Sequence, residues 1–331
     1  MSEEMFRPAP QVLAGDTADV YFLRTRQVME AEGLNPIATM EVFPHRDGLL
    51  CGMREVEALL REALPKGAEA WALGEGEAIS RGEVMLRINA PYLSYALYET
   101  AILGILAHES GWAQAARECV EAAQGVPVVS FGARHVHPLA APYMDYAAIV
   151  GGCASGSTPL GARMAGKEPS GTMPHAMIIC FGDTVKAAVA FDKHVEPDVP
   201  RVVLVDTFLD EPTEALRVAE ALGERLQGVR LDTPSELGGV TPELVKEARA
   251  RLDQAGFERV QLLVSGGVTP ERIRHFLSSG APVDSFGVGS YITSAQPNDF
   301  TADLKEVEGK PIAKRGRIPG ITENPRLKRL I

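Results

Sequence analysis

Short apolar runs alternate with longer amphipathic stretches through the second half of the chain. Runs of this kind are typical of strands buried on both faces of a parallel sheet, and a crossover helix must follow each one. The predicted strands are 126–130, 147–150, 176–180, 202–205, 228–231, 261–264 and 284–288, and the predicted helices are 212–226, 241–256 and 270–279. The last two helices follow Val-Thr-Pro, in which Thr is a good N-cap and Pro suits the first turn.

The alternation of strands and helices predicts right-handed crossovers and a parallel sheet. Six or seven strands are fewer than the eight of a complete barrel. We therefore expect an irregular α/β barrel over residues 125–298, with an open doubly wound sheet as the alternative.

The pattern before residue 125 differs and predicts a mixed α+β domain over residues 1–124. It comprises helices at 18–30, 54–64 and 92–124, the last broken near Gly111, a strand at 36–43 and two or three short strands within 70–90. The tail, 299–331, has no further crossover helix, and residues 303–315 suggest a hairpin that turns at Gly309. We expect this tail to return to the N-terminal domain and complete it.

Composition and charge narrow the partners. The 331 residues are enough for two domains, and a net charge of −11 argues against nucleic acid or an anionic membrane surface as a partner. No apolar run reaches membrane-spanning length, and the N-terminus lacks the pattern of a secretion signal. The four cysteines are widely spaced, which argues against a zinc site and favours a cytoplasmic protein.

Two carboxylates follow successive predicted strands, Asp206 after 202–205 and Asp232 after 228–231. In an α/β barrel the chemistry gathers where the strands end. Two carboxylates on one rim suit Mg²⁺ or a pair of ribose hydroxyls. Helix capping is the alternative reading of both residues.

Glycines follow the last two predicted strands, in Ser265-Gly266-Gly267 and Gly287-Val288-Gly289-Ser290. Such loops let backbone N–H groups approach a phosphate, and barrel phosphate sites often lie late in the chain. Plain tight turns are the alternative. A third segment, 161–168, nearly matches a P-loop, but Glu168 stands where Ser or Thr is needed, so we reject that reading.

An aromatic side chain, an arginine and a histidine add candidates for binding and catalysis. Phe131 and Arg134 follow the first predicted strand and suit a flat ring that carries an acid group. His135-x-His137 lacks an evident third metal ligand. His175, in a Gly- and Pro-rich loop, is a candidate nucleophile or phosphoryl acceptor, with a structural histidine as the alternative.

In their order along the chain, these segments resemble nicotinate phosphoribosyltransferase, of the type II phosphoribosyltransferase group. The segments that carry the resemblance are Thr17-Ala18-Asp19-Val20-Tyr21, Glu99-Thr100, Phe131-Gly132-x-Arg134, Gly151-Gly152, Gly171-Thr172-x-x-His175, Asp206-Thr207, Arg230-Leu231-Asp232-Thr233, Ser265-Gly266-Gly267, Gly287-x-Gly289-Ser290 and the tail from Gly309 to Arg315.

The resemblance implies an irregular α/β barrel with a split N-terminal domain that the tail completes. It implies that nicotinate and phosphoribosyl pyrophosphate give nicotinate mononucleotide and pyrophosphate, in NAD salvage. It further implies ATP as a co-substrate, hydrolysed through a phosphorylated His175, and Mg²⁺ as a cofactor. Because one residue of the ring sandwich comes from a neighbouring subunit in that family, a homodimer or larger homo-oligomer is implied.

The resemblance also assigns roles to residues. The implied catalytic residues are His175, Asp206 and Asp232, the two aspartates also serving as metal ligands. The implied nicotinate-binding residues are Tyr21, Phe131, Arg134 and Thr158. The implied phosphate- and ribose-binding residues are Arg230, Thr233, Ser265, Gly266, Gly267, Gly287, Gly289 and Ser290.

Thr158 bears on substrate choice, because a neutral hydroxyl donates to a carboxylate whereas an aspartate would repel it. This residue favours nicotinate. The alternatives are a quinolinate (decarboxylating) phosphoribosyltransferase, a nicotinamide phosphoribosyltransferase, and a non-catalytic nucleotide-binding barrel protein.

Overall fold

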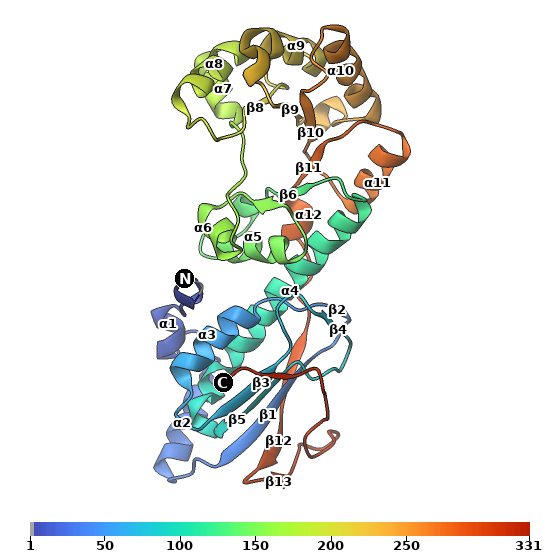
Figure 1. Ribbon diagram of the computed structural model, residues 1–331. Coiled ribbons are helices and arrows are strands. Elements are labelled where there is room, and N and C mark those ends of the chain that lie inside the picture. Colours follow the sequence, from blue (N-terminus) through green and yellow to red (C-terminus); the bar gives the residue numbers. More distant parts are fainter. Residues whose placement is uncertain (1–2) are drawn as a thin grey trace. The chain divides into compact units, whose positions relative to one another are not determined.

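A computed structural model describes residues 3–331 of the chain (Figure 1). It divides into two compact units. The first runs to Gln114 and resumes from Ala295 to Ile331, and the second is Ala115–Ser294. The domain limits predicted from the sequence, 1–124, 125–298 and 299–331, stay predictions.

The first unit combines a six-stranded sheet, a two-stranded sheet and helices. Its helical elements are η1 (Glu3–Phe6), α1 (Pro10–Ala14), α2 (Val20–Ala31), α3 (Met53–Ala63), η2 (Tyr92–Ser94), η3 (Ala96–Tyr98) and α4 (Glu99–Ala122), whose last turns belong to the second unit. Its strands are β1 (Ile37–Pro44), β2 (Gly48–Leu49), β3 (Glu69–Ala72), β4 (Ala78–Ile79), β5 (Leu86–Pro91), β12 (Phe300–Val307), β13 (Lys310–Pro311) and β14 (Lys328–Arg329).

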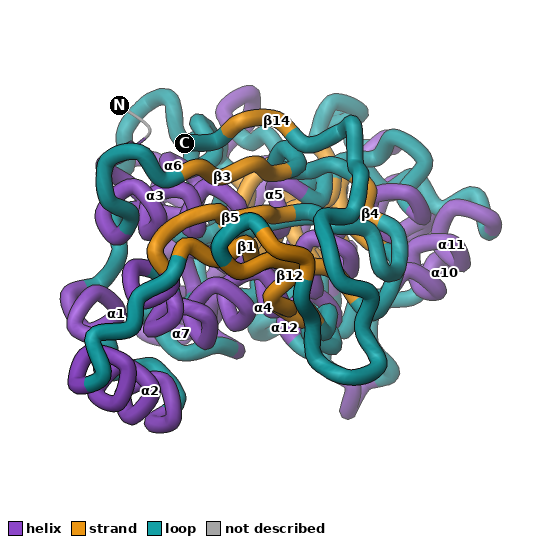
Figure 2. The backbone as a smooth tube through the Cα atoms, turned by 90° about the horizontal axis from the view of Figure 1, so that it is seen from below, coloured by secondary structure: helices purple, strands orange, loops and turns teal. Residues whose placement is uncertain are grey.

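The larger sheet of this unit has the order β13-β12-β1-β5-β3-β14, and its pairs are antiparallel. Figure 2 shows β12, β1, β5, β3 and β14 side by side in this order. The tail therefore supplies strands at both ends of the sheet, with β12 beside β1 (Figure 1). Residues of β5 alternate between buried and half-buried, as expected of a strand with one face on a core. That core unites β1 and β5 with α3 and α4.

The tail also covers the other face of this sheet. Glu41 of β1 is almost wholly buried and pairs with Arg87 of β5 at 2.7 Å. The backbone N–H of Thr322 donates to the same carboxylate at 3.0 Å. A buried charge must be paired and hydrogen-bonded, and the returning tail supplies one of these donors.

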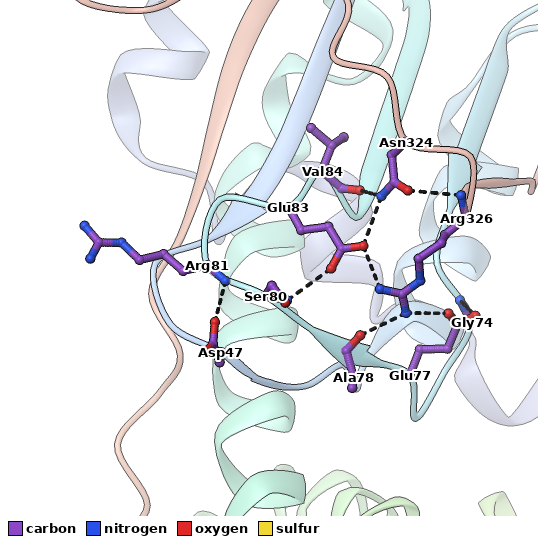
Figure 3. Close-up of polar contacts among 10 residues, drawn as sticks. All are labelled: Asp47, Gly74, Glu77, Ala78, Ser80, Arg81, Glu83, Val84, Asn324 and Arg326. Carbon is purple, nitrogen blue, oxygen red and sulfur yellow. Dashed lines mark hydrogen bonds and ion pairs between the residues drawn. The ribbon is translucent and has the colours of Figure 1, made fainter.

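Two tail residues hold the loop around β4. The Arg326 guanidinium contacts Glu77 at 2.9 Å and Glu83 at 2.6 Å, and Asn324 donates to the carbonyl of Val84 at 2.7 Å (Figure 3). Backbone donation from Gly74, reinforced by Arg326, lowers the pKa of the Glu77 carboxyl below its ordinary value. Several charges sharing one network stabilise more than isolated surface pairs do.

The second unit alternates strands and helices. Its strands are β6 (Val128–Ser130), β7 (Ser155–Gly156), β8 (Val202–Leu204), β9 (Gly228–Leu231), β10 (Gln261–Val264) and β11 (Ser285–Val288). Its helical elements are η4 (Ala133–His135), α5 (Ala141–Val150), α6 (Pro159–Met164), α7 (His175–Phe181), α8 (Thr184–His194), α9 (Glu211–Leu222), η5 (Gly223–Arg225), η6 (Ser235–Leu237), α10 (Pro242–Gln254), α11 (Pro270–Ser278) and α12 (Ser290–Thr293).

These six strands form one parallel sheet in the order β7-β6-β11-β10-β9-β8. Helices α8, α9 and α10 lie along the outside of β8, β9 and β10 (Figure 1). The predicted α/β architecture and parallel sheet are present, together with a separate antiparallel sheet. Within the described residues β7 and β8 are edge strands, so the sheet is a half-barrel and a barrel describes it only loosely.

Two predicted strands of this unit are helices. Residues 147–150 form the end of α5, and 176–180 lie within α7. A short apolar run does not distinguish a buried strand from a helix that is buried on most sides. Six of the ten residues of α5 are buried, Ala147 and Ala148 among them, so its sequence lacks a polar face.

The long first-unit helix also differs from its prediction. Residues 92–98 form two 3-10 turns, and α4 continues through Gly111 without a break. A Cβ at Gly111 would lie 2.7 Å from the backbone oxygen of Gln296, so this glycine admits a neighbouring chain segment rather than ending the helix.

The predicted helix starts at Val-Thr-Pro are confirmed. Thr241 accepts from the backbone N–H of Leu244 at 3.2 Å, and Thr269 accepts from that of Arg272 at 3.3 Å. Each cap satisfies one of the free N–H groups in a first helical turn. None of the helices in the described part of the chain is both long and apolar enough to span a bilayer.

Candidate active site

A cavity of about 550 Å³ opens in the second unit at the carboxyl ends of its strands. Parallel strands that end at one edge bring their following loops together, which is why ligands bind at that edge in α/β folds. The cavity collects most of the residues selected from the sequence: Phe131, Arg134, His175, Arg230, Asp232, Ser265, Gly266, Gly267, Gly287, Gly289 and Ser290.

Arg230 of β9 is the cation most firmly held in this cavity. Its Nη1 donates to Thr172 Oγ1 at 2.8 Å, and its Nη2 lies 3.2 Å from Asp232 Oδ2. The guanidinium carbon stands 5.6 Å from the centroid of the Phe131 ring. A planar cation held by a carboxylate and stacked near an aromatic ring is preorganised to receive an anion.

The Phe131 ring rests directly on Gly287 of β11. A Cβ at Gly287 would lie 2.4 Å from Phe131 Cε2, which no side chain tolerates. The sequence suggested a phosphate role for this glycine. The structure adds a packing reason, because the ring lies where a side chain would be.

Asp232 and the loop after β10 form a second group. Ser265 Oγ donates to Asp232 Oδ1 at 2.9 Å. Gly266 has a φ of +85°, and a Cβ there would meet the same carboxylate oxygen at 2.8 Å. Arg272 of α11 donates to the carbonyls of Gly266 at 2.7 Å and Gly267 at 3.1 Å, which fixes the loop from behind.

His175 and Asp206 form a pair. His175 is the first residue of α7, and its Nε2 lies 2.9 Å from Asp206 Oδ2. The imidazole is partly exposed at the cavity, whereas the carboxylate is almost wholly buried. The other carboxylate oxygen, Oδ1, is buried without a hydrogen-bond partner. A buried unpartnered carboxylate oxygen is costly, so Asp206 is a strong acceptor for a further donor or a cation.

Four of the predicted site residues do not line the cavity: Asp206, which contacts His175, and Thr158, Thr233 and Tyr21. Thr158 is the N-cap of α6 and accepts from Gly161 N at 3.3 Å, while Thr233 is buried and donates to Glu211. Tyr21 belongs to α2 of the first unit, where more than half of its surface is exposed. The ligand roles given to these residues stay predictions.

Residues that the sequence did not single out also belong to this site. Ser157 and Met173 line the cavity, as does His135, which had been considered as a metal ligand, and Arg272 supports its glycine loop. The Ser157 hydroxyl donates to Asp145, a carboxylate of α5 with no exposed surface. Ser157 directly adjoins Thr158, which had been considered, whereas Asp145 sits in an apolar stretch and gives no comparable signal.

A separate group lies in the first unit. Among the described residues, Cys51, Glu75 and Glu109 alone bring three potential metal-ligand atoms within 4.8 Å of one another. Burial, followed by repulsion from neighbouring carboxylates, raises the pKa of both the Cys51 thiol and Glu109. Cys51 and the N–H of Gly52 donate to Glu75 at 3.1 and 2.9 Å, so neutral hydrogen bonds account for this cluster.

The half-barrel, its glycine loops and its strand-end carboxylates are typical of proteins that bind a phosphorylated substrate. Comparison with known proteins identifies the family. The descriptions "Quinolinate phosphoribosyl transferase, N-terminal domain" and "C-terminal domain" match residues 19–110 and 112–303. The chain belongs to the quinolinate phosphoribosyl transferase family.

Similar proteins extend the comparison. The crystal structure of nicotinate-nucleotide pyrophosphorylase from Pyrococcus furiosus is 45% identical, with a TM-score of 0.86 over 95% of this chain and 81% of that one. A human nicotinate-nucleotide pyrophosphorylase [carboxylating] is 28% identical over 74% of this chain and 75% of its own. A Mycobacterium tuberculosis nicotinate phosphoribosyltransferase is 36% identical over 69% of this chain. The chain spans about half of that curated relative, 49% of its length.

These findings correct the family named from the motifs. Both domain models belong to the quinolinate phosphoribosyl transferase family, so assignment to the nicotinate phosphoribosyltransferase family was wrong. The ATP-coupled nicotinate reaction, the phosphorylated His175 and ATP as a co-substrate had been carried over from that assignment and fall with it. The motifs misled because glycines and carboxylates at strand ends recur in many phosphate sites of parallel sheets and do not distinguish one family from another.

Proposed function

We propose that this chain transfers the phosphoribosyl group of phosphoribosyl pyrophosphate to quinolinate, with loss of carbon dioxide. The products are nicotinate mononucleotide, pyrophosphate and CO₂. One observation carries the proposal: a single cavity joins an aromatic ring, two arginines and glycine-rich strand ends in a chain matching both domains of the quinolinate phosphoribosyl transferase family.

Quinolinate is a flat pyridine with two adjacent carboxylates. Phe131 supplies a ring face, and Arg134 and Arg230 supply guanidinium groups that suit carboxylates. The imidazoles of His135 and His175 line the same cavity. This local basic lining lets a chain with a net charge of −11 bind a strongly anionic substrate.

The sugar diphosphate is proposed to bind along the remaining rim. Backbone N–H groups of the loops 265–267 and 287–290 are available for phosphate oxygens, with Ser265 and Ser290 beside them. Asp232, held by Arg230 and Ser265, is proposed to accept from ribose hydroxyls. Thr233, buried against Glu211, is proposed to support this loop rather than to contact phosphate.

The reaction needs two bond changes at the ring. The pyridine nitrogen bonds to the ribose carbon C1 while the bond from C1 to pyrophosphate breaks. The bond from ring carbon C2 to its carboxylate then breaks, and the carboxylate leaves as CO₂. The electron pair of that bond stays on C2 and takes up a proton. Positive charge on the ring nitrogen stabilises that electron pair, so the protein mainly aligns the reactants and stabilises the leaving pyrophosphate.

Mg²⁺ remains a prediction at Asp206 and Asp232. The unpartnered buried oxygen of Asp206 fits a cation, and carboxylate oxygens are the ligands that Mg²⁺ prefers. When bound, such an ion supplies positive charge to the diphosphate. Of the two residues, Asp232 contacts Ser265 in the loop after β10, and Asp206 orients His175.

The test is a substrate panel. The purified full chain is incubated with phosphoribosyl pyrophosphate, Mg²⁺ and quinolinate, nicotinate or nicotinamide, each with and without ATP. Pyrophosphate, CO₂ and mononucleotide are measured. We expect quinolinate to give pyrophosphate and CO₂ in equal amounts, with no effect of ATP.

Release of pyrophosphate from nicotinate without CO₂, faster than from quinolinate, would overturn the proposal. Arg230→Ala serves as the site control, because it removes the cation that contacts both Phe131 and Asp232. Arg274→Ala is the matched surface variant, since Arg274 pairs with exposed Glu271 and is not among the described residues that line the cavity. Activity lost equally in both variants would also contradict the assignment of the cavity.

A further inference from the structure

Asp145 is a buried carboxylate directly behind the cavity wall. It lies on α5 and has no exposed surface. Its Oδ1 accepts from Ser130 Oγ at 2.7 Å, and its Oδ2 accepts from the Thr158 N–H at 2.7 Å and from Ser157 Oγ at 3.3 Å. All three partners are neutral donors, so hydrogen bonds alone compensate for its desolvation.

The packing around this carboxylate permits little movement. A Cβ at Gly156 would lie 2.7 Å from Asp145 Cβ, and one at Gly161 would lie 2.8 Å from it and 2.5 Å from the carbonyl oxygen of Pro142. Gly156 in the loop from Ser155 to Thr158, and Gly161 in α6, therefore let these segments pack directly against Asp145. Ser157, in the middle of this loop, faces the cavity.

The hydrogen bonds determine what Ser157 offers a ligand. An ionised carboxylate only accepts, and a serine hydroxyl has a single proton. Ser157 gives that proton to Asp145, so only the lone pairs of its oxygen remain for the cavity. A ligand group beside Ser157 is favoured when it is an N–H or the polarised C–H edge of a pyridinium, and disfavoured when it is a carboxylate.

We propose that Asp145 is a positioning residue that fixes Ser157 as a hydrogen-bond acceptor in the pyridine subsite. This turns the carboxylates of the acid away from Ser157 and toward Arg134 and Arg230. The kinetic part of the inference rests on the proposed function. The binding part does not, because it concerns only the polarity of one wall of the cavity.

Four substitutions separate the positioning role from a structural one. Asp145→Ala removes the acceptor. Asp145→Asn keeps the acceptor, because the amide oxygen still accepts from Thr158 and Ser157. The amide nitrogen then donates to Ser130, whose hydroxyl oxygen can accept instead of donating. Ser157→Ala removes the group at the cavity. Ser130→Ala is the matched control, since it deletes a donor to the same carboxylate at a position with no exposed surface.

The kinetic readout is the division between the two substrates. We expect Asp145→Ala to raise the KM for quinolinate about tenfold or more, which corresponds to the loss of one buried hydrogen bond. The KM for phosphoribosyl pyrophosphate should stay within about twofold of the wild-type value. Asp145→Asn and Ser130→Ala are expected to stay near wild type. Equal KM changes in Asp145→Ala and Ser130→Ala, or in both substrates, would leave Asp145 a purely structural residue and overturn the proposal.

The binding readout uses calorimetry with pyridine-3-carboxamide and pyridine-3-carboxylate, without turnover. Ser157→Ala should weaken the amide about threefold to tenfold and the acid by less, because both lose the acceptor for the ring C–H edge but only the amide also loses an acceptor for its N–H. Weaker binding of the acid alone, or no binding of either ligand to the wild type, would refute the acceptor role. A wild type that binds both ligands but fails to turn over quinolinate would instead count only against the proposed function.

Discussion

Glu99, at the start of α4, is a carboxyl group whose ionisation opposes folding near neutral pH. Burial, followed by repulsion from Asp303 and Asp19, raises its pKa to about 7, and Lys314 opposes this only in part. The ordinary pKa is 4.5, so between pH 4.5 and about pH 7 this carboxyl is protonated in the folded state and ionised in the unfolded state. The stability linked to Glu99 is full below pH 4.5 and is lost as the pH rises through 7.

Glu99→Gln should therefore stabilise the first unit at pH 8 but not at pH 4.5. Because Glu99 is only partly buried, we expect a gain of about 1–2 kcal/mol at pH 8, less than the full shift would give. Chemical denaturation across this pH range measures it. Glu62→Gln, at an exposed position of α3, is the control and should show no such trend. A constant difference between Glu99→Gln and wild type at every pH would contradict the assignment.

Single residues of the site differ in how far the sequence reveals them. Asp232 was predicted because it follows an apolar run, where a parallel strand brings it to the rim, whereas Arg230 was selected only through the family resemblance. Asp145 was not predicted, because it stands alone within the largely apolar run Ala-Pro-Tyr-Met-Asp-Tyr-Ala-Ala, which gives no sign of a carboxylate beneath a loop. Its role depends on the pairing of β6 with β7, which local sequence does not specify.

At the scale of elements, the strands between α8 and α12 were predicted closely. Strands β9, β10 and β11 each pair with a neighbour on both sides, and β8 pairs with β9 at the edge of the sheet. Their sequences are therefore mainly apolar, and the stretches between them carry helix signals. The two-residue strand β7 was missed, since a pair of small residues has no periodicity. The same scarcity of signal explains why a half-barrel was not distinguished from a more complete one.

Strand β11 carries a prediction of its own, because Gly287 lies under the Phe131 ring. Gly287→Ala should force this ring to move, at a cost of about 1–3 kcal/mol in unfolding free energy. Since the ring is the proposed stacking face, we also expect kcat/KM for quinolinate to fall tenfold or more, roughly the loss of one aromatic contact. Thermal unfolding and steady-state kinetics measure the two effects.

Gly104→Ala is the matched control for this substitution. Gly104 lies within α4, and a Cβ there would meet no atom within 4 Å. Alanine should stabilise this helix by about 0.5–1 kcal/mol without changing the kinetics. If Gly287→Ala were as harmless as Gly104→Ala, the Phe131 ring would not be held where the structure has it.

At the scale of the molecule, the first unit is discontinuous in sequence. β12 pairs with β1 through seven residue pairs, and β14 closes the opposite edge on β3. The second unit, by contrast, is one continuous segment, Ala115–Ser294. We propose that the chain divides on unfolding near the predicted domain limits, with the tail required by the first unit alone.

A chain that ends at residue 294 tests this division. It lacks β12, β13 and β14, so β1 would become an unpaired edge strand. The Glu41 carboxylate would also lose the hydrogen bond from the backbone N–H of Thr322. We expect hydrogen exchange at β1 and β5 to approach the unfolded rate, while β9 and β10 keep their protection, because their pairing lies wholly within the second unit.

A chain ending at residue 320 keeps β12 and β13 but lacks the Arg326 network, and it should weaken protection in the first unit without abolishing it. Uniform loss of protection in both units would mean that the molecule unfolds as one cooperative body, and the proposed division would be wrong.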